Sequence, residues 1–221
     1  MEMLGAIFDM DGVLVDSYRA HFESWKRLAA AHGVQITEEQ FASTFGQTNR
    51  QIIPRFWGVS GQEADRWGDR KEQYYRELLQ TDFPEMDGAG DLIAALAAAG
   101  FRLAVGSSGP PENVEVVMRC LPNARLFTAT VSGAEVQHGK PDPEVFLLAA
   151  RKLGVRPSCC AVIEDSLSGL DAARRAGMTA IAITGTTPRE KLEAAADLVV
   201  DSLRRLSPGR IKSLILDKAK G

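Results

Sequence analysis

The sequence has little cysteine, and what it has is poorly spaced for bridging. Its 221 residues include three cysteines, and two of these, Cys159 and Cys160, are sequence neighbours that cannot readily bridge each other. We therefore interpret all three, Cys120 included, as small buried hydrophobic residues in a reducing compartment. A disulfide scaffold, a redox centre and a cysteine-based metal site are not favoured.

Net charge and long apolar runs are also missing. The chain balances 26 basic against 29 acidic residues, so its net charge is only -3, and no overall field would attract nucleic acid or an anionic membrane. The longest apolar stretches, 92–99 and 180–183, fall far short of the roughly 20 residues that span a bilayer. The first residues lack the basic and apolar regions of a signal peptide. We expect a cytoplasmic monomer that binds neither nucleic acid nor membranes.

Short β-branched apolar runs alternate with helical patterns, which is typical of an α/β protein with a parallel sheet. Strands are predicted over 4–8, 101–105, 126–131, 160–163, 179–183 and 198–200. Helices are predicted over 87–99, 111–119, 143–153 and 166–176, with a last, fraying helix in the lysine-containing tail 212–221. The predicted fold is a Rossmann-like, doubly wound sheet.

One connection is too long for this pattern. Roughly ninety residues separate the first strand from the second, although a crossover needs only a dozen or so. Within that stretch, helical patterns cover 18–32, 38–45, 49–57 and 61–79. We therefore predict an α/β core domain formed by 1–15 and 87–221, and an inserted, all-helical cap domain formed by 16–86.

Polar residues cluster where the predicted strands end. They are Asp9 and Asp11 after the first strand, Ser107 and Ser108 after the second, Lys140 in a Gly-Lys-Pro segment ahead of a helix, and Glu164 and Asp165 after the fourth. In an open parallel sheet, ligands bind outside the carboxyl ends of the strands, near the point where the winding reverses. We expect these residues to form one site.

Four carboxylates in one site need a cation. Two carboxylates about 4 Å apart repel by ~4 kcal/mol at an effective dielectric constant of 20, and one lysine cannot neutralise four of them. An all-oxygen ligand set without nearby histidine or cysteine favours Mg²⁺ over zinc. The metal and Lys140 together would hold a dianionic phosphoryl group.

Asp9 and Asp11 are spaced for joint chemistry. Residues two apart in an extended chain point to the same side, so both carboxylates can face one reacting centre. One can attack phosphorus while the other protonates the leaving oxygen. Ser107 and its loop can bind the transferred oxygens, and Lys140 can offset developing charge. No Gly-rich P-loop with its lysine is present, so a nucleoside triphosphatase mechanism is not supported.

These motifs resemble, in the same order, the four motifs of the haloacid dehalogenase superfamily. They are Asp9-Met-Asp-Gly-Val-Leu-Val-Asp-Ser, the strand-end Ser107, Gly139-Lys-Pro and Val162-Ile-Glu-Asp-Ser-Leu-Ser-Gly-Leu. The chain is most similar to the branch with a helical cap after the first strand, which includes β-phosphoglucomutase, phosphoglycolate phosphatase and sugar phosphatases. The dehalogenases usually lack the second aspartate, so Asp11 opposes dehalogenation.

The resemblance implies a role for each core residue. Asp9 would be the nucleophile, forming an aspartyl-phosphate, and a metal ligand. Asp11 would be the general acid and base, and would give a backbone carbonyl to the metal. Asp165, with Glu164 directly or through water, would complete the Mg²⁺ site. Ser107 and Lys140 would bind the phosphoryl group.

The cap resembles that of β-phosphoglucomutase, which implies substrate-binding residues there. The matches are His21 with Phe22 and Trp25-Lys26, the loop Gly46-Gln-Thr48, and Lys71 with Tyr75. The substrate-binding residues predicted on this basis are His21, Asn49, Arg50 and Lys71, together with Ser108 of the core. The loop departs from the mutase pattern, which has an arginine where this sequence places Asn49.

Each cap residue also has a purely structural interpretation. His21 is consistent with a histidine that lies between helices with its hydrogen bonds satisfied. Lys71 is consistent with a solvated helical face in the charged run 69–72. Asn49 and Arg50 fit a helix start and a surface charge. The aromatic residues Trp25, Phe56, Trp57 and Trp67 are expected to form the core of the cap.

Three functions remain open from the sequence. The leading one is a Mg²⁺-dependent phosphatase that acts on a small phosphorylated metabolite, such as a sugar phosphate, through an aspartyl-phosphate. The alternative is a β-phosphoglucomutase-type phosphosugar mutase, which the Asn49 departure disfavours. A signalling receiver module would also gather acids, a hydroxyl and a lysine at strand ends, but the helical insert opposes it.

Overall fold

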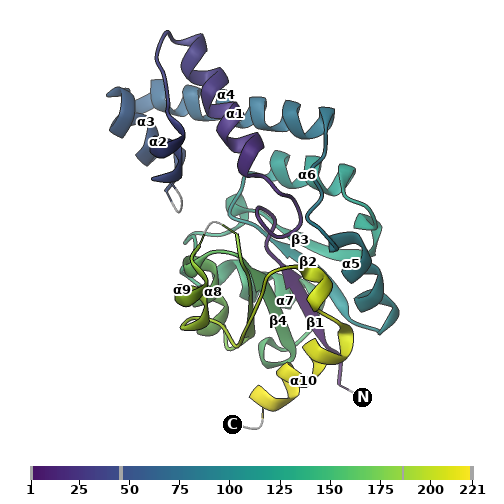
Figure 1. The fold of residues 1–221 in the computed structure, drawn as a ribbon. Helices are drawn as coiled ribbons and strands as arrows, with labels where there is room; N and C mark the ends of the chain where they lie inside the picture. Colours follow the sequence, from purple (N-terminus) through teal and green to yellow (C-terminus); the bar gives the residue numbers. More distant parts are fainter. Residues whose placement is uncertain (1, 45–46, 186, 220–221) are drawn as a thin grey trace. The chain divides into compact units, whose positions relative to one another are not determined.

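The computed structural model describes residues 2–44, 47–185 and 187–219, which form two compact units (Figure 1). The larger unit comprises Met1–Asp16 and Glu85–Gly221, and the smaller comprises Ser17–Pro84. These boundaries lie one and two residues from the predicted ones. Residues 85 and 86, where the chain returns from the smaller unit, belong with the larger unit. Val15 pairs with Glu85 there, and the Met86 N–H donates to the Leu14 carbonyl at 3.1 Å.

The larger unit is built on a six-stranded, entirely parallel sheet with the strand order β3-β2-β1-β4-β5-β6. The strands are β1 Gly5–Phe8, β2 Arg102–Gly106, β3 Phe127–Val131, β4 Cys160–Glu164, β5 Thr179–Ile183 and β6 Leu198–Val200. Every predicted strand is present to within one residue at either end. The order reverses between β1 and β4, so the predicted doubly wound fold is confirmed.

Helices cover both faces of this sheet. They are α5 Ala89–Ala98, α6 Pro111–Cys120, α7 Glu144–Leu153, α8 Leu167–Arg175, α9 Arg189–Glu193 and α10 Pro208–Lys218. α7 contacts β1, β2, β3 and α8, whereas α5 contacts β2 and α10. Because crossovers are right-handed, reversing the winding puts these two pairs of helices on opposite faces. None of the helices in the described part of the chain is long and apolar enough to cross a membrane.

The last helix begins earlier than predicted. α10 starts at Pro208 rather than at residue 212, because the Ser207 side chain accepts a hydrogen bond from the Arg210 N–H and Pro208 occupies the first turn.

The central strands of the sheet are buried, in agreement with their apolar sequences. Strands β1, β4 and β5 are buried along their whole length, as a parallel sheet covered on both faces requires.

All three cysteines are free thiols. Cys159 and Cys160 are buried, as predicted, whereas Cys120 at the end of α6 is half-buried. Their interpretation as packing residues therefore holds fully for the first two.

Helices are the only regular secondary structure in the described residues of the smaller unit. Its helices are α1 Tyr18–Ala31, α2 Glu38–Ala42, α3 Asn49–Trp57 and α4 Gly61–Thr81, and α4 packs against α1 and α3. Trp25 and Trp67 belong to its buried core, and Phe56 and Trp57 pack against that core. The prediction that these aromatic residues form the cap core is confirmed.

Candidate active site

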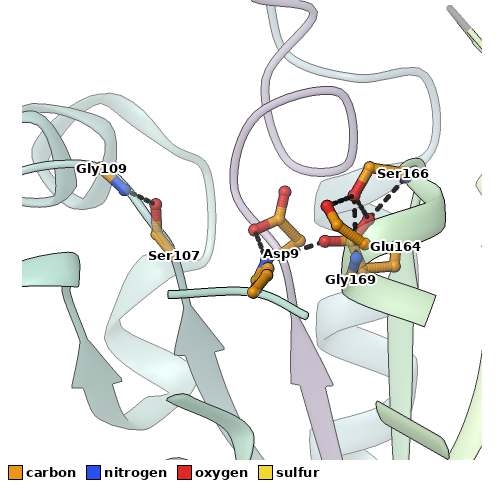
Figure 2. A network of polar contacts seen from close by, with 8 residues as sticks. Asp9, Ser107, Gly109, Glu164, Ser166 and Gly169 are labelled. Carbon is orange, nitrogen blue, oxygen red and sulfur yellow. Dashed lines mark hydrogen bonds and ion pairs between the residues drawn. The ribbon is translucent and has the colours of Figure 1, made fainter. Parts of the chain in front are cut away.

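Two acidic residues lie at the carboxyl ends of adjacent strands, at the same edge of the sheet. Asp9 follows β1, and its N–H donates to the Ile163 carbonyl at 2.9 Å, which extends the β1–β4 pairing by one residue. Glu164 is the last residue of β4. Figure 2 shows Asp9 with Glu164 and Ser166 on one side, and with Ser107 and Gly109 on the other. This is the point where the sheet order reverses.

Lys140 joins the two carboxylates. Its Nζ donates to Asp9 Oδ1 at 2.6 Å and to Glu164 Oε1 at 2.7 Å. The lysine side chain is only 6% exposed. Burial alone would lower the pKa of Lys140, but the attraction of Asp9 and Glu164 outweighs it and raises that pKa. Lys140 is therefore a permanent cation.

Asp9, Glu164 and Asp165 form a group in which one carboxylate oxygen from each residue lies within 4.8 Å of the other two. Burial raises the pKa of Asp9 to about 7; Lys140 opposes this shift, whereas Glu164 and Asp11 add to it. Burial, followed by repulsion from Glu164 and Asp9, raises the pKa of Asp165 well above its ordinary value. One lysine thus leaves the cluster with uncompensated negative charge.

This donor set fits a hard divalent cation. The ligand atoms are buried or half-buried carboxylate oxygens, and neither histidine nor cysteine belongs to the group. Oxygen ligands of this kind suit Mg²⁺ or Ca²⁺ rather than zinc. A dication would also relieve the mutual repulsion that, together with burial, raises the pKa values of Asp9 and Asp165.

Asp11 lies in the turn that follows β1. It is half-buried, its backbone pairs with Val15, and the Gly12 N–H donates to the Val15 carbonyl at 2.9 Å. Its charge contributes to the raised pKa of both Asp9 and Asp165. Its side chain is outside the three-carboxylate group found among the described residues. The predicted metal contact through its backbone carbonyl stays a prediction.

Glu164 is held in place by Ser166 and packs closely against Gly169, two residues for which the sequence predicted no role of their own. Its Oε2 accepts hydrogen bonds from the Ser166 N–H at 2.6 Å and the Ser166 Oγ at 2.8 Å. Ser166 Oγ also accepts from the Gly169 N–H at 3.1 Å, which caps α8. A Cβ on Gly169 would overlap the Glu164 carboxylate. The sequence does carry a signal for this contact: Ser166 stands directly ahead of a helix, where serine is a preferred N-cap residue.

A second close approach fixes Asp165. Gly12 adopts φ +77°, and a Cβ there would overlap the Asp165 carboxylate. Glycine at this position therefore satisfies both the left-handed turn after Asp11 and the space that Asp165 occupies.

Ser107 begins the loop that follows β2. It is buried, its N–H donates to the Val131 carbonyl at 2.9 Å, and its Oγ accepts from the Gly109 N–H at 3.0 Å. A hydroxyl that accepts in this way still has its own proton to donate. Ser108, the neighbouring residue predicted to bind substrate, is exposed.

In the smaller unit, Lys71 is buried rather than solvated. Its side chain is 3% exposed, and its Nζ lies 2.8 Å from His21 Nδ1 and 2.9 Å from Glu72 Oε1. The His21 ring stacks on the fully buried ring of Tyr75, with centroids 4.1 Å apart. The interpretation of this stretch as a solvated helical face is therefore wrong for Lys71.

The other two predicted cap residues are engaged within their own unit. Asn49 is the first residue of α3, and its Nδ2 donates to Glu72 Oε1 at 2.8 Å. Arg50 is exposed and donates to Asp65 Oδ1 at 2.7 Å. Gly46 of the predicted substrate loop lies outside the described residues. Glu72 was missed because its contact with Asn49 depends on how two helices pack.

The fold and its acidic strand ends define a class of enzyme. A family model described as haloacid dehalogenase-like hydrolase matches residues 3–177, and the chain belongs to that family. The resemblance found in the sequence is thereby confirmed.

Individual relatives are similar over most of the chain. The phosphorylated carbohydrates phosphatase of Thermotoga maritima is 32% identical over 185 residues, covering 81% of this chain and 84% of that protein. The β-phosphoglucomutase of Bacillus subtilis is 31% identical over 207 residues, covering 90% and 89%. The crystal structure of a haloacid dehalogenase hydrolase from Entamoeba histolytica superposes with a TM-score of 0.88 at 28% identity, covering 97% of this chain and 100% of that one.

Proposed function

We propose that this enzyme is a Mg²⁺-dependent phosphatase that hydrolyses a small phosphorylated metabolite, a sugar phosphate, through a phosphoaspartate on Asp9. The observation that carries the proposal is the buried cluster in which Lys140 bridges Asp9 and Glu164 while Asp165 lies within 4.8 Å of both acids. The family supports hydrolysis, and the relative from Thermotoga maritima is named for phosphorylated carbohydrates. The monomeric state and the cellular location expected from the sequence stay predictions.

The proposed reaction has two steps at phosphorus. An oxygen of Asp9 attacks the phosphorus, and the bond to the leaving sugar oxygen breaks while Asp11 donates a proton to that oxygen. Asp11 then takes a proton from water as the water oxygen attacks the same phosphorus. This step releases inorganic phosphate and restores the Asp9 carboxylate. Lys140 and Ser107 bind the phosphoryl oxygens as negative charge develops on them.

The metal would be held by Asp9, Asp165 and the backbone carbonyl of Asp11, with Glu164 binding directly or through water. When bound, Mg²⁺ would offset the charge of the carboxylates and of the phosphoryl group. This assignment rests on the donor set, and on the burial and the repulsion from Glu164 that raise the pKa of Asp9.

We assign substrate recognition to His21, Lys71, Asn49 and Arg50 of the cap, with Ser108 of the core. The charges within the cap favour a phosphatase over the alternative mutase. The Lys71 ammonium is paired with Glu72, and the neutral Asn49 donates to the same carboxylate. A second phosphate on the substrate would meet that carboxylate beside the lysine, which disfavours handling of bisphosphates. The mutase stays the alternative because the Bacillus subtilis relative has that name.

A substrate screen tests the proposal. The purified chain is incubated with sugar phosphates, nucleotides and phosphoglycolate in the presence of Mg²⁺, and inorganic phosphate is measured. We expect release of phosphate from at least one sugar phosphate. Release of phosphate from no compound in the screen would contradict a phosphatase. Incubation with β-glucose 1-phosphate and a bisphosphate primer tests the alternative, because formation of glucose 6-phosphate without phosphate release would establish a mutase.

A further inference from the structure

The segment that carries Lys140 lies outside regular secondary structure, yet it is tied at both ends to the start of α7. Oε2 of Glu144 accepts hydrogen bonds from the backbone N–H groups of Gln137 and His138, both at 3.0 Å. The Glu144 N–H in turn donates to Asp142 Oδ1 at 3.0 Å. One glutamate thus engages the chain on both sides of Lys140.

The loop closes further on itself. The Asp142 N–H donates to the Gly139 carbonyl at 3.0 Å, which makes a turn around Lys140. Together these bonds fix the backbone from residue 137 to residue 144. A lysine side chain has many accessible rotamers, so its Nζ can be held at one point only if its backbone is held as well.

The anchor of this loop is rigid. Glu144 begins α7, which packs on β1, β2 and β3. Two residues further along the same helix, the centroid of the buried Phe146 ring lies 4.8 Å from Lys140 Nζ. The negative charge of Glu144 also suits a helix N-terminus. Hydrogen bonds from the backbone N–H groups of His138 and Gln137 hold the pKa of Glu144 below its usual range, so the carboxylate is ionised at neutral pH.

We propose that Glu144 is a positioning residue, which holds the 137–142 segment so that Lys140 Nζ stays between Asp9 and Glu164. The proposal rests on the role assigned to Lys140 in the proposed function. Through one carboxylate oxygen, Glu144 accepts from the two backbone amides, and that oxygen also lies 3.5 Å from His138 Nδ1. Glu144 contributes nothing directly to the reacting atoms.

The kinetic test is a double-mutant cycle with a conservative rescue. Glu144→Ala removes the acceptor, whereas Glu144→Gln keeps one oxygen that can accept the same two N–H groups. We expect Glu144→Ala to lower kcat/KM about tenfold or more, and Glu144→Gln to stay within about threefold of the parent. In a Lys140→Ala background, Glu144→Ala should cost almost nothing further. Additive losses, or full activity of Glu144→Ala, would overturn the proposal.

Arg151→Ala is the matched control. Arg151 is exposed on the same helix, and its substitution removes a charged side chain from α7 without touching the loop. It should leave kcat/KM unchanged. If the Glu144→Ala protein fails to fold, Glu144→Asp replaces it, since aspartate keeps the charge at the helix start but withdraws the oxygen by one methylene group.

A second readout does not depend on activity. An amine-reactive acylating reagent should label the buried Lys140 slowly and the exposed Lys191 and Lys212 quickly, with mass spectrometry as the measurement. In Glu144→Ala or Glu144→Asp we expect labelling of Lys140 to rise several-fold relative to the two reference lysines, and in Glu144→Gln and Arg151→Ala to stay at the parent value. Unchanged labelling in a folded Glu144→Ala protein would contradict the proposal. A parent that hydrolyses no ester would refute the proposed function alone, because the labelling result would still decide the role of Glu144.

Discussion

Lys140 and Asp9 are separated by 131 residues in the sequence, yet Nζ of the lysine lies 2.6 Å from Oδ1 of the aspartate. The ion pair is almost fully buried, with the two side chains 6% and 10% exposed. Taking two charges out of water is costly, and this cost is recovered only when the surrounding groups complete the charge balance. Here the neighbouring acids tip that balance toward excess negative charge, which a divalent cation would offset.

Magnesium should stabilise the folded protein, and Asp165 should be needed for that effect. A ligand present at 100 times its Kd adds about 2.7 kcal/mol to the free energy of unfolding. In Asp165→Asn the shift in Tm caused by Mg²⁺ should shrink. The metal-free variant should also melt higher than the metal-free parent, because one of the mutually repelling carboxylates is gone. Thermal unfolding in EDTA and in millimolar MgCl₂ measures both effects.

The control for this experiment is Asp171→Asn. Asp171 lies on α8 and is paired with Arg175 at the surface. Its substitution should leave the Mg²⁺ shift intact, and potassium chloride of equal ionic strength should produce no comparable shift in the parent. A parent whose Tm ignores Mg²⁺ would contradict the metal assignment.

Gly169→Ala should disturb Glu164. The added Cβ would overlap a carboxylate that is 1% exposed and held by Lys140 and Ser166, so a buried group must move. Overpacking of this kind costs about 1–3 kcal/mol of unfolding free energy, and we expect a loss of phosphatase activity with it. The same substitution at Gly209 in α10, where nothing lies within 4 Å, should be neutral or stabilising. Equal effects at the two sites would show that Glu164 is not held as described.

Thr179→Val should stabilise the protein. Among the described residues, Oγ1 of Thr179 is a buried side-chain oxygen without a hydrogen-bond partner. Replacing an unsatisfied hydroxyl by a methyl group of similar size should raise the free energy of unfolding by about 1 kcal/mol. Thr44→Val is the opposing control, because the buried Thr44 Oγ1 donates to the Phe41 carbonyl at 2.6 Å, and losing that bond should lower stability. Urea denaturation compares them, and a destabilised Thr179→Val protein would reject the argument.

The contribution of Glu144 to stability should depend on pH. Its pKa is lowered in the folded state, so the ionised carboxylate stabilises the protein above the unfolded pKa, and this contribution is lost as pH falls through the folded pKa. The difference in unfolding free energy between the parent and Glu144→Gln should therefore be present near neutral pH and shrink below about pH 4. A difference that does not change with pH would mean that the charge of Glu144 plays no part.

Much of the fold was predictable because it depends on local patterns. β-branched apolar runs specify buried parallel strands, and the acidic residues lie at or directly after the ends of those strands, so the sequence alone places Asp9, Glu164 and Asp165 at one edge of the sheet. The length of the first connection was enough to predict the helical insertion. The end of the chain was less clear, because the capping pair Ser207-Pro208 lies outside the apolar pattern that suggested the last helix.

Contacts that depend on helix packing were not predictable. Lys71 sits in a charged run, yet it shares one buried face of α4 with Ala64, Gly68 and Tyr75. The spacing of those three residues is typical of a buried helical face, but the charged residues on either side of Lys71 obscured that pattern. The contacts of Glu72 with Asn49 and of Glu144 with two backbone amides had no sequence signal, because they depend on loop and helix geometry.

Direct trapping of phosphorylated Asp9 tests the central claim. The enzyme is mixed with a hydrolysable sugar phosphate and Mg²⁺, quenched in acid and treated with borohydride, which converts an acyl phosphate of aspartate into homoserine. Peptide mass spectrometry should then find homoserine at position 9, and not in the Asp9→Asn variant, which should also be inactive. Homoserine at position 11 instead, or an Asp9→Asn enzyme with full activity, would contradict the account.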